Sequence, residues 1–145
     1  MSFEVREFKV SDYARARALW ERTPGVGLSA ADEEAPVLFY LRRNPGTSFV
    51  AVSTASDVLI GTVLCGHDGR RGLIHHLAVA SEHRRCGIGR ALVKAGLAGL
   101  REQGISKCHL MVFANNTEGL AFWARCGAQS RSELQLFSMP VQNVT

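Results

Sequence analysis

Apolar residues recur along the chain with two different periods, and the period identifies each secondary-structure element. Between positions 87 and 103 they return every three or four residues, which predicts an amphipathic helix that ends at Gly104. The buried stripe expected for this helix consists of Ile88, Leu92, Val93, Leu97 and Leu100. Residues 73–79 carry apolar side chains at both odd and even positions, so this strand is expected at the centre of a sheet.

The remaining segments complete an order of strand, two helices, three strands, helix, strand, helix and strand. Further strands are expected at residues 3–8, 48–54, 58–66, 108–113 and 134–139, and further helices at 12–20, 31–43 and 117–126. Short polar turns between the three central strands predict antiparallel pairs, and the helix before residues 108–113 predicts a right-handed parallel crossover. The expected fold is therefore a three-layer α/β domain with helices on both faces of a mixed sheet.

Length and composition narrow the class of protein. The 145 residues suffice for a single domain, 1–145, and 46% apolar with 21% charged residues is ordinary for a globular protein. The chain has no apolar run of membrane-spanning length, and its start lacks the apolar core of a signal peptide, so a cytoplasmic protein without a membrane partner is expected. The four cysteines show no C-x-x-C pair and no metal-binding spacing, so no metal is expected.

The net charge is +4, and the excess of basic residues lies after residue 34. Such an excess suits a polyphosphate ligand as well as a nucleic acid. The basic residues are scattered, without a basic run or a basic helix face, so no nucleic-acid partner is expected.

The most informative segment follows the central strand, where residues 80–90 read as a basic turn, two glycines and a helix start. The beginning of a helix leaves backbone N–H groups unpaired and carries a partial positive charge, and glycine lets an anion approach those groups. Arg84, Arg85 and Arg90 add full charges beside Gly87 and Gly89. The combination favours a diphosphate site over a glycine-rich helix start with solvated arginines.

Two other phosphate-binding motifs do not fit this segment. A dinucleotide-binding fingerprint requires G-x-G-x-x-G near the first strand, but this loop lies mid-chain and Leu92 occupies the position of the third glycine. A P-loop requires G-x-x-x-x-G-K-S/T, and neither a lysine nor a hydroxyl residue follows Gly89 in that way.

Two motifs in this part of the chain resemble those of the GCN5-related N-acetyltransferase (GNAT) family. Residues 84–89 (Arg-Arg-Cys-Gly-Ile-Gly) match the R/Q-x-x-G-x-G/A signature, and residues 115–128 resemble the second motif, N-x-x-x-x-x-F-Y-x-x-x-G-F, at the right separation. The turn within residues 61–72 is similar to that of small single-domain bacterial members. The resemblance implies a GNAT-like fold with six to seven mostly antiparallel strands, about four helices, and the parallel strands 73–79 and 108–113 splayed apart.

The resemblance also implies acetyl-CoA as the co-substrate and indicates which residues bind it. The backbone of residues 77–79 would hold the pantetheine arm, the N–H groups of the loop would hold the pyrophosphate, and Asn116 would cap the last helix and touch the cofactor arm. The cofactor-binding residues expected are Leu77, Ala78, Val79, Arg84, Arg85, Cys86, Gly87, Ile88, Gly89, Arg90 and Asn116.

Catalysis in this family is a direct attack of an amine on the thioester, which needs a proton acceptor, an oxyanion donor and a proton for the leaving thiolate. The resemblance implies the Val79 N–H as the donor and His75 as the base, two positions before Leu77 as in arylalkylamine acetyltransferases, with His76 and a water chain as the alternatives. Strict strand alternation puts His75 on the face of Leu77 and His76 on the other face. The tyrosine of the second motif is replaced by Trp123, which removes the usual acid.

Two functions follow from the resemblance. One is an acetyl-CoA-dependent N-acetyltransferase that acts on a primary amine of a small molecule or a peptide, and the other is a degenerate acetyl-CoA sensor, which Trp123 favours. Residues 32–34 (Asp-Glu-Glu) could attract a cationic amine, although a charged helix start is the commoner explanation. Many relatives pair as dimers, so a homodimer is a further expectation.

Overall fold

The computed structural model describes residues 2–141, which divide after Phe113 into two compact units. The first unit contains five strands, β1 (Phe3–Glu7), β2 (Phe49–Ser53), β3 (Leu59–His67), β4 (Gly72–Val79) and β5 (Cys108–Leu110). Its helices are α1 (Tyr13–Glu21), α2 (Glu34–Arg43) and α3 (Ile88–Glu102), with the short 3-10 turns η1 (Val10–Asp12), η2 (Ala30–Asp32) and η3 (Ser81–His83). The elements follow the order that the sequence predicts as far as β5.

The five strands lie side by side in their order along the chain. The pairs β1–β2, β2–β3 and β3–β4 are antiparallel, and β4–β5 is parallel, as the short turns and the long crossover through α3 predict. The mixed, mostly antiparallel sheet is thus confirmed, but residues 2–141 supply five strands to it and not six or seven.

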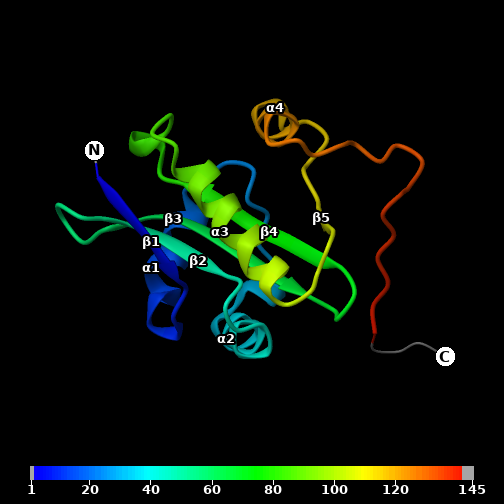
Figure 1. Ribbon diagram of the computed structural model, residues 1–145, viewed down its shortest axis with the longest axis horizontal. Coiled ribbons are helices and arrows are strands. Elements are labelled where there is room, and N and C mark those ends of the chain that lie inside the picture. Colours follow the sequence, from blue (N-terminus) through cyan, green and yellow to red (C-terminus); the bar gives the residue numbers. More distant parts are fainter. Residues whose placement is uncertain (1, 142–145) are drawn as a thin grey trace. The chain divides into compact units, whose positions relative to one another are not determined.

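Neighbouring residues of β3 establish that helices cover both faces of this sheet. The indole of Trp20 in α1 donates a hydrogen bond to Thr62 (2.9 Å), whereas a side chain at Gly61 would meet Ile88 and Leu92 of α3. Because successive strand residues point to opposite faces, α1 and α3 lie on opposite sides of the sheet. Figure 1 shows α3 crossing one face of the sheet.

The core lies around β3, whose residues from Leu59 to Gly66 are all buried. The stripe predicted for α3 is buried at Ile88, Leu92, Val93 and Leu100, whereas Leu97 remains 37% exposed at the edge of the packed face. Within residues 2–141, no helix combines the length and the apolar character needed to cross a membrane.

The last predicted strand, residues 134–139, does not form, and this prediction was wrong. Leu134, Leu136, Phe137 and Met139 expose between 59% and 82% of their surface, and no strand of the described chain pairs with the segment. A strand needs a partner for its backbone groups and a core for its apolar face, and the alternation of apolar residues supplies neither. β5 is also shorter than predicted and ends at Leu110.

The second unit contains the fourth predicted helix, α4 (Thr117–Arg125). The side-chain oxygen of Asn116 accepts a hydrogen bond from the N–H of Gly119 (2.9 Å), which is an N-cap. A Cβ at Gly119 would lie 2.6 Å from the Asn116 amide nitrogen, so glycine is needed there to keep the cap.

Two glycines of α3 test how closely this helix packs on the sheet. A Cβ at Gly99 would collide with the carbonyl oxygen of Gly46, whereas a Cβ at Gly96 would lie 3.7 Å from Cys65, at an ordinary contact distance. We expect Gly99→Ala to lower the free energy of unfolding by about 1–3 kcal/mol. The colliding atom belongs to the backbone of Gly46, so it cannot avoid the new methyl group by a side-chain rotation. We expect Gly96→Ala to raise it by up to about 1 kcal/mol, because alanine has the higher helix propensity. Urea unfolding followed by circular dichroism measures both, and equal effects would contradict this packing.

Candidate active site

Strands β4 and β5 separate partway along β4. Their pairing runs from Gly72 with Cys108 to Ile74 with Leu110, and it ends there. The rest of β4, residues 75–79, has β3 on one side and no strand of the described chain on the other. The two parallel strands therefore leave between them an unpaired stretch of backbone, which we call the open edge of β4 (residues 75–79).

The peptide groups of Leu77 and Val79 face this open edge. Ala80 donates its N–H to the carbonyl of Ile60 (2.9 Å), and Ala78 lies opposite Thr62 of β3. In an antiparallel pair the residues whose N–H and C=O groups point to the partner strand alternate with residues whose groups point away. The backbone groups of Leu77 and Val79 therefore point away from β3, where another extended chain can reach them.

The open edge continues directly into the arginine- and glycine-rich loop. After η3, Arg85 has φ +63° and Gly87 has φ +81°, and α3 begins at Ile88. A Cβ at Gly87 would meet no atom within 4 Å, so glycine is favoured at this position by the left-handed backbone and not by crowding.

The start of α3 leaves backbone amides without partners inside the helix, beside exposed basic side chains. The first hydrogen bond along the helix runs from the Ala91 N–H to the Gly87 carbonyl (3.1 Å), so the amides of the preceding turn point out of the helix end. The side chains of Arg84, Arg85 and Arg90 are exposed. This arrangement favours a bound anion through both the helix dipole and full charges.

A β-bulge in β4 changes the orientation that the sequence predicts for its two histidines. Thr62 and Leu64 of β3 pair with Ala78 and His75, so three steps along β4 match two steps along β3. The extra residue falls at His76, whose φ is +47°. The prediction that His75 and His76 point to opposite faces was therefore wrong, because both imidazoles contact groups on the α1 and α2 side of the sheet.

His76 is held on three sides. Its Nε2 lies 2.6 Å from Oδ1 of Asp32, at the end of η2, and its ring lies 4.7 Å from the Trp20 ring. Its carbonyl accepts a hydrogen bond from the Thr62 hydroxyl (2.9 Å), and that hydroxyl in turn accepts one from the Trp20 indole. The side chains of His76 and Asp32 are 14% and 12% exposed, so this pair is largely withdrawn from bulk water.

His75 lies beside this pair and has fewer polar contacts. Its ring packs edge-on against Tyr40 of α2, with centroids 6.1 Å apart, and the His76 ring is 6.5 Å away. Burial, reinforced by the neighbouring His76, lowers the pKa of His75, and the more weakly acting Asp32 carboxylate opposes that shift. The neutral imidazole is therefore the favoured form at neutral pH.

Two residues of the predicted constellation lie in the second unit. Asn116 caps α4, and its second expected role, contact with a cofactor arm, stays a prediction. Trp123 is half-buried, and its ring lies 5.3 Å from that of Phe122 in an edge-on arrangement.

Several residues around the histidines were not assigned from the sequence. Trp20 and Tyr13 lie in the helix predicted at residues 12–20, but the sequence does not place Tyr13 near the site, and Asp32 reads as one acid in a run of three. In the folded chain the Trp20 ring packs against His76 at a tilt of 59°, and the Tyr13 hydroxyl donates to the Asp32 carbonyl (2.6 Å). Tyr40 could not be placed from the sequence and packs on His75. Of these residues, only Asp32 was marked by a sequence signal, the run of three acids at positions 32–34. The aromatic residues come to the histidines only through the fold.

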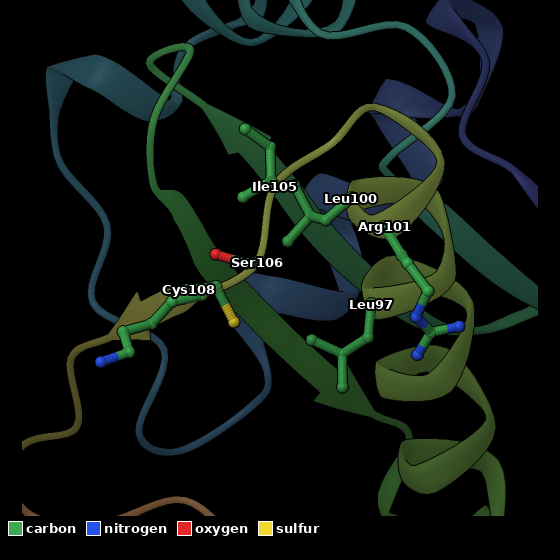
Figure 2. Close-up of a pocket in the computed structure, with 7 residues that line it drawn as sticks. Leu97, Leu100, Arg101, Ile105, Ser106 and Cys108 are labelled. Carbon is green, nitrogen blue, oxygen red and sulfur yellow. The ribbon is translucent and has the colours of Figure 1, made fainter.

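A separate pocket of about 470 Å³ lies at the other end of α3, between that helix and β5 (Figure 2). Its lining residues are Leu97, Leu100, Arg101, Ile105, Ser106, Lys107 and Cys108. The glycine-rich loop lies at the N-terminal end of α3, whereas this pocket adjoins its last turns, so the two features are distinct.

Among residues 2–141, no group of three or more His, Cys, Asp or Glu side chains is arranged to hold a metal ion.

The lowered pKa of His75 predicts how the protein responds to acid. An unfolded chain binds a proton at this side chain below the ordinary value of 6.5, whereas the folded chain binds it only at lower pH. The free energy of unfolding should therefore fall as the pH drops through this interval, and His75→Gln should weaken that dependence. The ring protons of His75 should titrate by NMR with a midpoint below 6.5, and a midpoint above it would contradict this environment.

Known proteins resemble this chain in sequence and in fold. The family model described as the acetyltransferase (GNAT) family matches residues 13–128. Similar solved structures include Ard1 from Thermoplasma volcanium, with a TM-score of 0.75 and 24% identity over 88% of this chain and 82% of that one. The paiA N-acetyltransferase from Thermoplasma acidophilum in complex with coenzyme A has a TM-score of 0.71 and 20% identity, over 87% of this chain and 89% of that one. Glucosamine-6-phosphate N-acetyltransferase from Arabidopsis thaliana has a TM-score of 0.68 and 21% identity, over 96% and 99%. These structures share the fold, and the family match over most of its length shows that the chain belongs to the acetyltransferase (GNAT) family.

Proposed function

We propose that the protein is an N-acetyltransferase that transfers the acetyl group of acetyl-CoA to a primary amine by direct attack. One observation carries the proposal: the open edge of β4 leads, without an intervening element other than η3, into a basic loop at the start of α3. Family membership independently supports acetyl transfer as the class of reaction.

The edge and the loop are suited to different parts of acetyl-CoA. The pantetheine arm is an extended chain with amide groups, and it would pair with the backbone of Leu77 and Val79, beside Ala78, as an added strand does. The diphosphate would lie at the start of α3, where amides, dipole and arginines all favour negative charge. The loop residues that contribute to this cradle are Arg84, Arg85, Cys86, Gly87, Ile88, Gly89 and Arg90. Asn116 is proposed to touch the cofactor arm as well as to cap α4.

The transfer itself needs an oxyanion donor and a proton acceptor. When the amine nitrogen bonds to the thioester carbon, negative charge develops on the carbonyl oxygen, and the Val79 N–H at the open edge would donate a hydrogen bond to it. A neutral imidazole on β4 would take the proton that the amine must lose. The resemblance implies His75 for this role, and the structure places His76 in the same stretch of β4.

The fate of the thiolate separates this proposal from its alternative. The C–S bond breaks as the amide forms, and CoA leaves as a thiolate that takes a proton from water, because Trp123 cannot act as an acid. An acetyl-CoA sensor that binds but does not transfer is the second candidate, and the replacement of tyrosine by Trp123 is what favours it.

The acceptor is proposed only as a class, a primary amine on a small molecule or a peptide. A cytoplasmic location and a homodimer stay predictions from the sequence and the family.

Release of CoA from acetyl-CoA in the presence of a panel of amines and peptides tests the proposal. Amine-dependent release, with the acetylated product identified by mass, supports the enzyme and identifies its acceptor class. Tight binding of acetyl-CoA without transfer to any amine would favour the sensor, and recovery of transfer in Trp123→Tyr would identify the missing acid as the reason.

The Val79 N–H can be removed selectively. Val79→Pro deletes this donor, and because the group faces the open edge, no hydrogen bond to β3 is lost. We expect kcat to fall by about 10²–10³-fold, the effect typical of losing one oxyanion donor. Val79→Ala keeps the N–H and serves as the control, with a much smaller loss. Equal activity of the proline and alanine variants, both folded by circular dichroism, would exclude this donor.

A further inference from the structure

The pairing of His76 with Asp32 joins two segments 44 residues apart in the chain. One partner lies in the open edge of β4, next to Leu77, and the other closes η2 on the α1 side of the sheet. Both side chains are largely buried, yet neither belongs to the constellation that the family motifs indicate. From the sequence, His76 was expected on the other face of the strand and only as an alternative base, and Asp32 was expected in a charged helix start that could attract a cationic amine.

We propose that His76, oriented by Asp32, is the group that accepts the proton of the attacking amine. The inference rests on the proposed acetyl transfer and specifies its base. It makes His76 a catalytic residue and Asp32 a positioning residue, whose effect passes through the imidazole.

The hydrogen bond to Asp32 determines which nitrogen of His76 can accept a proton. An ionised carboxylate can only accept hydrogen bonds, so the Nε2 of His76, 2.6 Å from Oδ1, carries the ring proton. Nδ1 then holds a lone pair, and it makes no hydrogen bond to any residue of the described chain. It also keeps some contact with solvent, because Tyr40 Oη is the sole fully buried and unpaired side-chain polar atom within residues 2–141. In the proposed reaction the attacking amine approaches Nδ1.

Asp32 is itself held in place. Its Oδ2 accepts a hydrogen bond from the Ser29 N–H (2.9 Å), and its carbonyl accepts one from the Tyr13 hydroxyl (2.6 Å) and one from Arg17 (3.0 Å). When His76 takes a proton, the resulting imidazolium faces this fixed carboxylate at hydrogen-bonding distance. A carboxylate so placed holds the ring in one orientation and one tautomer.

The backbone of His76 adopts an unfavourable conformation, and this conformation directs the imidazole towards Asp32. A left-handed backbone with φ +47° is unfavourable for a non-glycine residue, and the bulge is kept by the Thr62 hydroxyl on the His76 carbonyl and by Trp20 against the ring. A strand without the bulge would turn the imidazole away from Asp32, to the α3 side of the sheet.

His75 has none of these supports. Its ring makes no hydrogen bond to a described residue, and its neighbours are the Tyr40 ring and His76. Burial lowers its pKa, which makes it a weaker base, and no carboxylate touches it to stabilise the charged form. Of the two histidines in the open edge, His76 is therefore the one built to accept a proton.

The reaction balances with this base. The amine nitrogen bonds to the thioester carbon, one of its protons passes to Nδ1 of His76, and the C–S bond breaks with its electron pair on sulfur. The imidazolium returns its proton to water, and the thiolate takes one from water, so that amine and acetyl-CoA become amide and CoA thiol.

His76→Gly tests the base directly, because glycine accepts the left-handed backbone and leaves a space the size of the ring beside Asp32. We expect kcat with the acceptor amine to fall by about 10²–10⁴-fold, the range for losing a general base, while the Kd of CoA stays unchanged. Added imidazole should restore part of kcat, which it cannot do for a residue that only packs. His67→Gln, at the other end of β3, is the control and should retain wild-type activity.

Asp32→Asn tests the positioning role. Asparagine keeps the shape of the side chain but can donate to Nε2, which moves the ring proton to Nδ1 and blocks the accepting atom. We expect kcat to fall by about tenfold or more with the KM for acetyl-CoA unchanged, and a change confined to KM would overturn this role.

The outcomes separate the inference from the function on which it rests. Transfer by the wild type together with near-wild-type kcat of His76→Gly, or a larger loss in His75→Gln than in His76→Gly, overturns the assignment of His76 alone. No amine-dependent CoA release by the wild type overturns the transferase proposal, and the base with it.

Discussion

The β-bulge at His76 is the constraint on which the arrangement of the site depends. One extra residue in β4 shifts its register against β3, and every side chain after it changes face relative to a regular strand. The bulge lies just beyond Ile74, the last residue of β4 that pairs with β5. A regular β4 would carry the same sequence but would present different side chains beside the open edge.

The bulge is held by contacts from α1, which gives that helix a role beyond filling the core. The indole of Trp20 donates to Thr62, Thr62 donates to the His76 carbonyl, and the Trp20 ring packs on the imidazole. Tyr13 of the same helix fixes the backbone of Asp32. Helix α1 thus connects the core of the sheet to the histidine, and the interior of the protein and the site share the same residues.

Features that depend on local patterns are predicted well from the sequence. Features that depend on how strands pair with one another are not. The stripe of α3 and the turns around β3 are local patterns, so the helix, the hairpins and the parallel crossover are confirmed. The loop motif marks Gly87 for the approach of an anion, whereas its left-handed backbone, φ +81°, becomes visible only in the fold. The bulge leaves no such mark, since His75, His76 and Leu77 continue an ordinary strand pattern. Residues 134–139 show the converse failure, in which an alternating pattern has no partner strand in the described chain and stays exposed.

Backbone geometry accounts for the link between fold and proposed chemistry. Parallel strands that separate leave N–H and C=O groups unpaired, and such groups are the natural partners of an extended amide chain. The loop that follows adds positive charge at the start of α3, and the bulge brings a carboxylate-bound imidazole to the same stretch of β4. The family match supports acetyl transfer as the class of reaction, and these three features support the proposal that acetyl-CoA is the donor.

The most direct measurement is a titration of the ¹⁵N-labelled protein with CoA, followed by amide chemical shifts. The account predicts that the largest changes occur at the amides of Leu77 and Val79 and along residues 85–90, where the backbone faces the open edge or the start of α3. Changes confined to the pocket around Leu100 and Cys108, or no saturable change at all, would contradict it.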